Sequence, residues 1–100
     1  MHDRIVQNFL DLAILLELRN RSLSSHDVID FAHKKFQIAL TSGTVSTHLS
    51  ALEKDGLIKA EDSQGKGVYA LTERGKETIA EIFSIRDKIL GLFVNLFVGE

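Results

Sequence analysis

Apolar residues recur at helical spacing from the start of the chain. Ile5, Phe9, Leu12 and Leu16 stand three or four residues apart, which predicts an amphipathic helix over about residues 3–20. Further apolar residues between these positions widen the stripe, so more than one face of this helix is apolar. We therefore expect this helix to be covered on two sides.

The next stretch of helical periodicity is shorter. Ser24 or Ser25 can accept hydrogen bonds from the free N–H groups of a first turn, which predicts a second helix that ends at about Lys35. The apolar residues expected to form its buried side are Ile29, Ala32 and Phe36.

A third helix is predicted shortly afterwards. Thr41 suits its N-cap, the helix covers about residues 42–55, and Gly56 suits the left-handed position that follows a helix. Its expected buried stripe consists of Val45, Leu49 and Leu52. The short connection from about residue 36 to 40 is typical of a helix-turn-helix, whose second helix enters the DNA major groove.

The periodicity then changes from helix to strand. Two short segments, Leu57–Glu61 and Val68–Thr72, flank the polar, glycine-bearing residues 62–67, which predicts a β-hairpin with a six-residue turn. Thr72 can cap a long last helix over about Glu73–Val98, where no proline interrupts the chain.

The predicted fold class is mostly α with one β-hairpin, in the order α-α-α-β-β-α of a winged helix-turn-helix. We expect one domain over residues 1–100. Residues 1–72 would form the DNA-binding core and wing, and residues 73–100 a C-terminal dimerisation helix.

The third helix is expected to present small, polar residues opposite its buried stripe. Hydroxyl groups can donate or accept at base edges and phosphates, and small side chains let the helix backbone come close to the groove. This predicted reading face comprises Gly43, Thr47 and Ser50, flanked by Thr44 and Ser46. The alternative interpretation is an ordinary solvated helix face.

The hairpin also has a functional interpretation. Its tip, which includes Gln64 and Lys66, would lie along the DNA backbone, where Lys66 could meet a phosphate. The alternative is a solvated turn without a ligand.

Two segments resemble a known group of regulators. Thr41-Ser-Gly-Thr-Val-Ser-Thr-His-Leu-Ser-Ala-Leu-Glu-Lys-Asp-Gly-Leu-Ile58 is similar to the recognition-helix segment of the PadR, ArsR and MarR families, and Val68-Tyr-Ala-Leu-Thr-Glu-Arg-Gly-Lys76 to the wing strand and following helix of PadR-like proteins. The resemblance implies a winged helix-turn-helix transcriptional regulator, PadR-like in the first place. It implies reading residues Ser42, Thr44, Ser46, Thr47 and His48, with Lys66 in the wing.

The chain departs from those families at two points. The recognition helix lacks the arginine and aromatic residues that are frequent there, and the metal-binding cysteines of many ArsR-like sensors are absent. Strong phosphate-driven affinity and metal sensing are therefore not implied.

The last helix carries more apolar residues than one small domain can bury. Its apolar residues repeat at alternating steps of three and four, the spacing of a coiled-coil seam, and a second stripe runs beside it. We predict a homodimer whose interface is formed by the first and last helices of both chains. Such a dimer would place two reading helices about one DNA turn apart. The expected interface residues are Val6, Leu10, Ile82, Ile85, Ile89, Leu92, Phe93 and Leu96. The alternative is that these residues belong to one monomeric core.

Charge does not by itself indicate a nucleic-acid partner, because the formal net charge is −2. Its distribution is more informative, since residues 31–52 and 63–72 contain no Asp or Glu and include Lys34, Lys35 and Lys66. We expect double-stranded DNA as the partner. The alternative is a winged-helix module that binds an acidic protein instead of DNA.

Enzyme chemistry is not expected. The chain has no cysteine, which excludes disulfides and thiolate sites. It shows no phosphate-cradling glycine loop and no clear serine, histidine and carboxylate arrangement. His26 and His33 stand seven residues apart without an evident third ligand, so we expect no metal and no cofactor.

The surroundings of the protein can also be inferred. No apolar run approaches the length that spans a bilayer, and no signal peptide is evident, so we expect a cytoplasmic protein without membrane contact. The excess apolar residues of the last helix leave room for an effector of unidentified chemistry at the dimer interface. Ligand-dependent thermal shifts would test that hypothesis.

Overall fold

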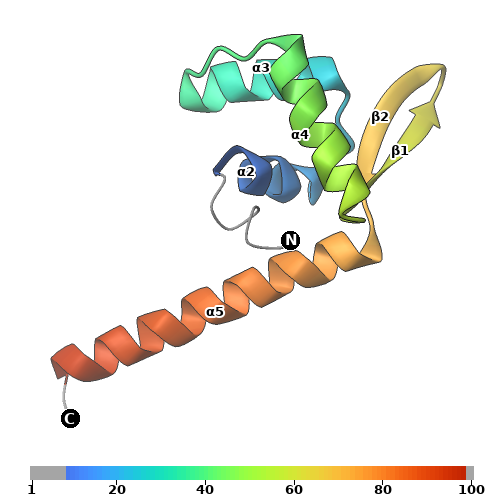
Figure 1. Cartoon of the computed structure of the whole chain (residues 1–100). Helices are drawn as coiled ribbons and strands as arrows, with labels where there is room; N and C mark the ends of the chain where they lie inside the picture. The colour runs from blue at the N-terminus through green and yellow to red at the C-terminus, as the bar shows by residue number, and fades with distance from the viewer. Residues whose placement is uncertain (1–8, 99–100) are drawn as a thin grey trace.

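Four helices and one antiparallel hairpin make up residues 9–98, the part of the chain that the computed structural model describes (Figure 1). The elements in chain order are α2 (Phe9–Leu18), α3 (Ser25–Phe36), α4 (Ser42–Lys54), β1 (Ile58–Ser63), β2 (Lys66–Leu71) and α5 (Glu73–Val98). The predicted order α-α-α-β-β-α is confirmed. Ile5 and Val6 lie outside the described residues.

α3 begins at a capping box. The hydroxyl oxygen of Ser24 accepts from the backbone N–H of Asp27 at 3.1 Å, and the Asp27 carboxylate accepts from the backbone N–H of Ser24 at 2.9 Å. The predicted buried side of α3 is corrected, because Val28, Phe31 and Ala32 are buried, whereas Ile29 and Phe36 are only half-buried. Both sets have helical spacing, and the packing of α3 against α4 selects the face that includes Val28.

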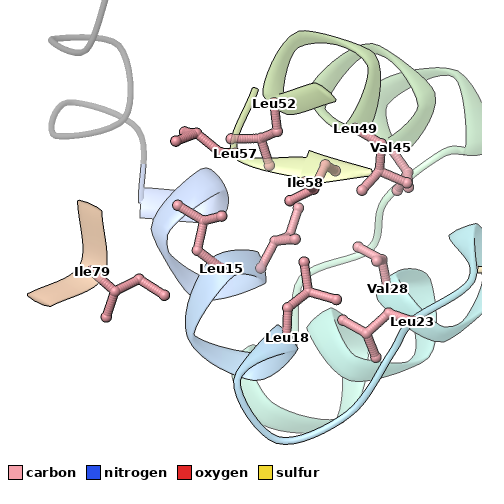
Figure 2. Packing of buried hydrophobic residues seen from close by; sticks show 11 residues of the cluster. Leu15, Leu18, Leu23, Val28, Val45, Leu49, Leu52, Leu57, Ile58 and Ile79 are labelled. Atoms are coloured by element: carbon pink, nitrogen blue, oxygen red, sulfur yellow. The ribbon is translucent and has the colours of Figure 1, made fainter. Parts of the chain in front are cut away.

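The core lies where α2, α3, α4 and the hairpin meet the first turns of α5 (Figure 2). Leu15 and Leu18 of α2 are buried in one cluster with Leu49 of α4, Ile58 of β1 and Ile79 of α5. Each fully buried side chain of this kind contributes about 1.5–3 kcal/mol of transfer free energy. The predicted buried stripe of α4 is confirmed, since Val45, Leu49 and Leu52 all belong to this cluster.

The hairpin turn is shorter than predicted. β1 and β2 pair from Ile58 with Leu71 to Ser63 with Lys66, which leaves a two-residue turn of Gln64 and Gly65. Their φ angles of 55° and 76° are the positive values that a type I′ turn requires, and the twist of this turn matches that of the strands. The six-residue turn predicted over residues 62–67 is therefore wrong, because its outer residues pair in the ladder.

The hairpin is attached to the helices through Leu23 and Thr72. Leu23 and Tyr69 exchange backbone hydrogen bonds of 3.1 and 2.7 Å, which form an isolated bridge. The Thr72 hydroxyl donates to the Gly56 carbonyl at 2.6 Å and accepts from the N–H of Gly75 at 3.0 Å. Thr72 therefore caps α5, as predicted, and ties its start to the end of α4.

α5 extends away from the other elements along most of its length (Figure 1). Ile79 is buried in the core, and Ile82 and Phe83 pack against it, but the large apolar side chains from Ile85 to Leu96 are exposed. No helix within residues 9–98 has the length and apolar character needed to cross a membrane.

Candidate functional site

The outward face of α4 is a continuous surface of small, polar residues. Val45, Leu49 and Leu52 point into the core, His48 and Ala51 are half-buried beside them, and the other positions of the helix are turned to solvent. Six predicted reading residues are brought together on this surface, and all are exposed: Ser42, Gly43, Thr44, Ser46, Thr47 and Ser50. We call these six residues the α4 face. No large side chain stands on it, so the helix backbone is open to close approach.

Hydrogen bonds at the start of α4 determine which groups remain for a ligand. Thr41 caps the helix, since its hydroxyl oxygen accepts from the backbone N–H of Thr44 at 3.1 Å and its proton is donated to the Thr44 hydroxyl at 3.0 Å. The Thr47 hydroxyl donates to the Gly43 carbonyl at 3.0 Å. Thr44 can therefore donate its own proton outward, and Thr47 presents its oxygen as an acceptor.

The first turn of α4 favours an anion. It contains no acidic residue, and the free N–H groups of a helix N-terminus carry partial positive charge. Lys34 and Lys35 are exposed near the end of α3, the preceding helix of the helix-turn-helix. Lys35 is partly engaged elsewhere, because its Nζ lies 3.6 Å from a carboxylate oxygen of Glu17 and 5.6 Å from the ring centre of Phe31.

His48 is placed at the edge of the α4 face. Its Nδ1 lies 2.6 Å from Oδ1 of Asp11 on α2, and 20% of its side chain is exposed, whereas Asp11 is fully buried. Asp11 was not among the residues predicted for the site. The available signal was an acidic residue inside an otherwise apolar stretch, Phe9-Leu-Asp-Leu-Ala-Ile14, where a carboxylate needs a partner.

The wing carries both signs of charge. Gln64 and Lys66 are exposed at and beside its turn, and the carboxylates of Glu61 and Asp62 are exposed on the neighbouring strand. The pKa of Asp27 is lowered, first by the backbone hydrogen bond from Ser24 and to a smaller extent by the charge of Lys66.

The histidines do not form a metal centre in the described part of the chain. His26 Nε2 lies 3.5 Å from a carboxylate oxygen of Asp30, one turn along α3, and His33 is exposed on the same helix. Among residues 9–98, no three side chains of the metal-binding types are grouped to hold an ion.

An apolar groove of about 380 Å³ runs between α2, α3 and α5, away from the α4 face. Its apolar walls include Phe9, Leu12, Leu16, Phe31, Phe36 and Phe83. Phe9 is 59% exposed and contacts Phe36 edge-on, with ring centres 5.0 Å apart.

The predicted interface residues fall into three groups. Ile85, Ile89, Leu92, Phe93 and Leu96 are exposed, with 56–81% of each residue accessible. Leu10 and Ile82 are half-buried against the core of the same chain. Val6 lies outside the described residues.

Residues 14–90 match the family model described as a winged helix DNA-binding domain. This range includes α4, the whole hairpin and most of α5. No curated protein is significantly similar to the chain in sequence.

Solved structures with the same fold include several transcription regulators. A PadR-family regulator from Clostridium difficile R20291 is 23% identical, with a TM-score of 0.67 over 92% of this chain and 100% of the other. A putative transcriptional regulator from Thermoplasma acidophilum is 22% identical, with a TM-score of 0.72 over 97% and 98% of the two chains.

A third solved structure contains DNA. Bacillus subtilis PadR in complex with operator DNA is 25% identical, with a TM-score of 0.66. The match covers 76% of this chain and 47% of the Bacillus protein, so the chain corresponds to about half of that regulator. The predicted resemblance to PadR-like winged helix proteins is thus confirmed.

Proposed function

The chain belongs to the family of winged helix DNA-binding domains, and we propose that it is a dimeric, cytoplasmic transcriptional regulator that reads duplex DNA with α4. In this proposal the α4 face enters the major groove, and the wing, through Gln64 and Lys66, contacts the DNA backbone. Residues 1–72 supply the DNA-binding unit, and residues 73–100 supply the helix that joins two copies. The known complex of Bacillus PadR with operator DNA supports duplex DNA as the partner.

The observation that carries the proposal is the α4 face. Six exposed residues, none larger than threonine, lie on the second helix of the helix-turn-helix. A helix with such a surface can approach base edges closely, and its hydroxyls supply both donors and acceptors. Thr44 and Thr47 add opposite hydrogen-bonding roles, since one has a proton free to donate and the other an oxygen free to accept.

Dimerisation is supported by the apolar surface that one chain leaves uncovered. Ile89, Leu92 and Leu96 are more than half exposed on the part of α5 that extends beyond the core. The groove between α2 and α5 lies on the same chain and is also lined by apolar side chains. A two-fold partner would cover both surfaces and set two α4 helices at successive major grooves.

A second function, binding an acidic protein surface through the same α4 face, is favoured by one observation. Asp62 is exposed on the wing, where it would repel a phosphate backbone, whereas the exposed Glu61 carboxylate lies 3.7 Å from Nζ of Lys59. Protein contacts tolerate such mixed charge more readily than DNA contacts do.

Binding to labelled genomic duplex fragments distinguishes these functions. We expect the wild-type protein to bind selected fragments with an affinity that falls steeply between about 50 and 200 mM salt. Thr47→Glu places a negative charge on the α4 face and should abolish this binding. Ser84→Glu places the same charge on the exposed surface of α5 and should leave it intact.

The opposite outcomes have a clear meaning. If the wild-type protein binds no duplex even at low salt, the proposed DNA binding is wrong, and binding of an acidic protein surface becomes the favoured function. If Thr47→Glu and Ser84→Glu bind equally well, the protein binds DNA through another surface.

A further inference from the structure

A fully buried carboxylate lies beneath the α4 face. Asp11 has no exposed surface, and the only other buried polar side chain within residues 9–98 is the helix cap Ser24. A carboxylate removed from water is costly unless hydrogen-bond donors replace the lost solvent. His48 supplies such a donor from α4, 37 positions further along the chain.

The hydrogen bond determines which nitrogen of His48 faces outward. An ionised carboxylate can only accept, so the Nδ1 of His48 must carry the proton in this bond. The distance of 2.6 Å is short, as expected for a charge-assisted hydrogen bond. The remaining ring nitrogen, Nε2, is thereby left for a partner outside the protein, and one fifth of the side chain is exposed at the edge of the α4 face.

We propose that Asp11 is a positioning residue that holds the His48 ring with Nδ1–H directed inward, so that Nε2–H of the imidazolium donates to a DNA phosphate. This role rests on the proposed DNA binding, and it adds a phosphate contact to the contacts that the α4 face makes. His48 and Thr44 are four residues apart and lie on the same stripe of the helix, at its border with the core. A group at that border meets the backbone beside the groove rather than the base edges within it.

The contact depends on pH. The imidazolium can donate from Nε2 to a phosphate oxygen, whereas the neutral ring with its proton on Nδ1 presents an acceptor there and cannot. α4 also packs on α3 and β1, but no titratable side chain of their described residues forms a hydrogen bond or ion pair with the ring. Asp11 of α2 is the charged group that faces it.

Two substitutions separate the structural bond from the DNA contact. In His48→Asn the side-chain amide reaches the position of Nδ1, so it can still donate to Asp11 but offers nothing at Nε2. In His48→Gln the amide reaches the position of Nε2, and the bond to Asp11 is lost. We expect His48→Asn to keep the wild-type melting temperature and His48→Gln to lower it.

DNA binding gives the decisive comparison. The probe is a random-sequence duplex of about 30 base pairs, long enough for two successive major grooves. At pH 6 we expect His48→Asn to bind about tenfold more weakly than wild type, the loss typical of a hydrogen bond to a charged group. At a pH at which the His48 ring of the wild-type protein is neutral, the two should bind alike. At pH 6 the slope of log affinity against log salt concentration should also be smaller for His48→Asn than for wild type, by the amount expected for about one phosphate contact per protomer.

Two further measurements test the role of Asp11, the first of them without DNA. A long-range ¹H–¹⁵N spectrum of the wild-type protein should show the His48 ring protonated at Nδ1 at pH 8. In a DNA-binding titration at pH 6, Asp11→Asn, which keeps an acceptor but loses the charge, should bind as weakly as His48→Asn. A ring protonated only at Nε2 would overturn the proposal even if the Asp11 variant does not fold.

Other outcomes also decide the matter. Equal DNA binding by wild type and His48→Asn at pH 6 would make the pair purely structural. A loss of the same size whether the ring is charged or neutral would show a ring that accepts from a base, which contradicts the phosphate contact. Absence of any duplex binding by the wild-type protein would refute the proposed function itself and this inference with it.

Discussion

Gly75 lies in the first turn of α5 at a point where two elements touch, and its replacement by alanine should destabilise the protein strongly. A Cβ atom at this position would collide with the backbone carbonyl oxygen of Leu57 and approach Cδ2 of Leu71 to 3.0 Å. The Leu71 side chain can turn away, but the carbonyl group cannot move freely. It accepts a hydrogen bond of 3.1 Å from the N–H of Thr72.

The size of the effect follows from these contacts. Overpacking of a close contact costs about 1–3 kcal/mol, and a shift of the Leu57 carbonyl would weaken a hydrogen bond worth about 1 kcal/mol. The higher helix propensity of alanine returns about 1 kcal/mol at most. We therefore expect Gly75→Ala to lower the free energy of unfolding by about 2 kcal/mol, which corresponds to a fall in Tm of roughly 8–16 °C for a domain of this size.

Gly43→Ala is the matched control, because Gly43 also stands in the first turn of a helix. Its added Cβ would meet only the Thr41 hydroxyl oxygen, at an ordinary contact distance of 3.9 Å. Thermal denaturation followed by circular dichroism should show a Tm for Gly43→Ala equal to or slightly above that of the wild-type protein. If Gly75→Ala melts together with Gly43→Ala, the close packing of α5 on Leu57 is wrong.

Further predictions concern DNA binding, assembly and pH. Gly43→Ala should fold normally but bind duplex DNA about tenfold more weakly, because a methyl group on the α4 face takes up space that the groove needs; unchanged affinity in a gel-shift titration would argue against close approach. Lys66→Gln should lower the slope of log affinity against log salt by the amount expected for about one phosphate contact per protomer. An unchanged slope would show that Lys66 of the wing does not contact a phosphate. Ile89→Lys should shift the sedimentation coefficient from dimer to monomer, whereas Glu81→Lys on the same helix should not. Because the pKa of Asp27 is lowered in the folded state, its carboxylate stabilises the fold above its ordinary pKa, and this contribution is lost as pH falls through the folded pKa. Urea denaturation should therefore show a stability gap between wild type and Asp27→Asn at pH 7 that narrows towards pH 3, and a constant gap would contradict the capping role.

The local signals of the sequence determined the order of the elements and the starts of α3, α4 and α5. Thr41 and Thr72 were predicted as N-caps, with Ser24 or Ser25 for the second helix, and Ser24, Thr41 and Thr72 each accept the expected backbone hydrogen bond in the structure. A cap acts on N–H groups within three residues, so its effect can be read from the chain without knowing the fold. The buried stripe of α4 and the polar surface opposite it follow from the same short-range periodicity.

The hairpin marks the limit of such local reasoning. Glycine and polar residues indicated a turn, but they did not show that Asp62 pairs with Gly67 and Ser63 with Lys66. The position of a turn is set by cross-strand register, and register depends on which residues of the two strands meet.

Only the tertiary structure decided which distant residues meet. Asp11 of α2 and His48 of α4 are separated by 37 positions and by the whole of α3, and neither residue carries a local signal for the other. The same holds for Gly75 beneath the Leu57 carbonyl and for the groove between α2, α3 and α5. Caps and periodicity act through bonds between near neighbours in the chain, whereas these contacts exist only because the core brings whole helices together.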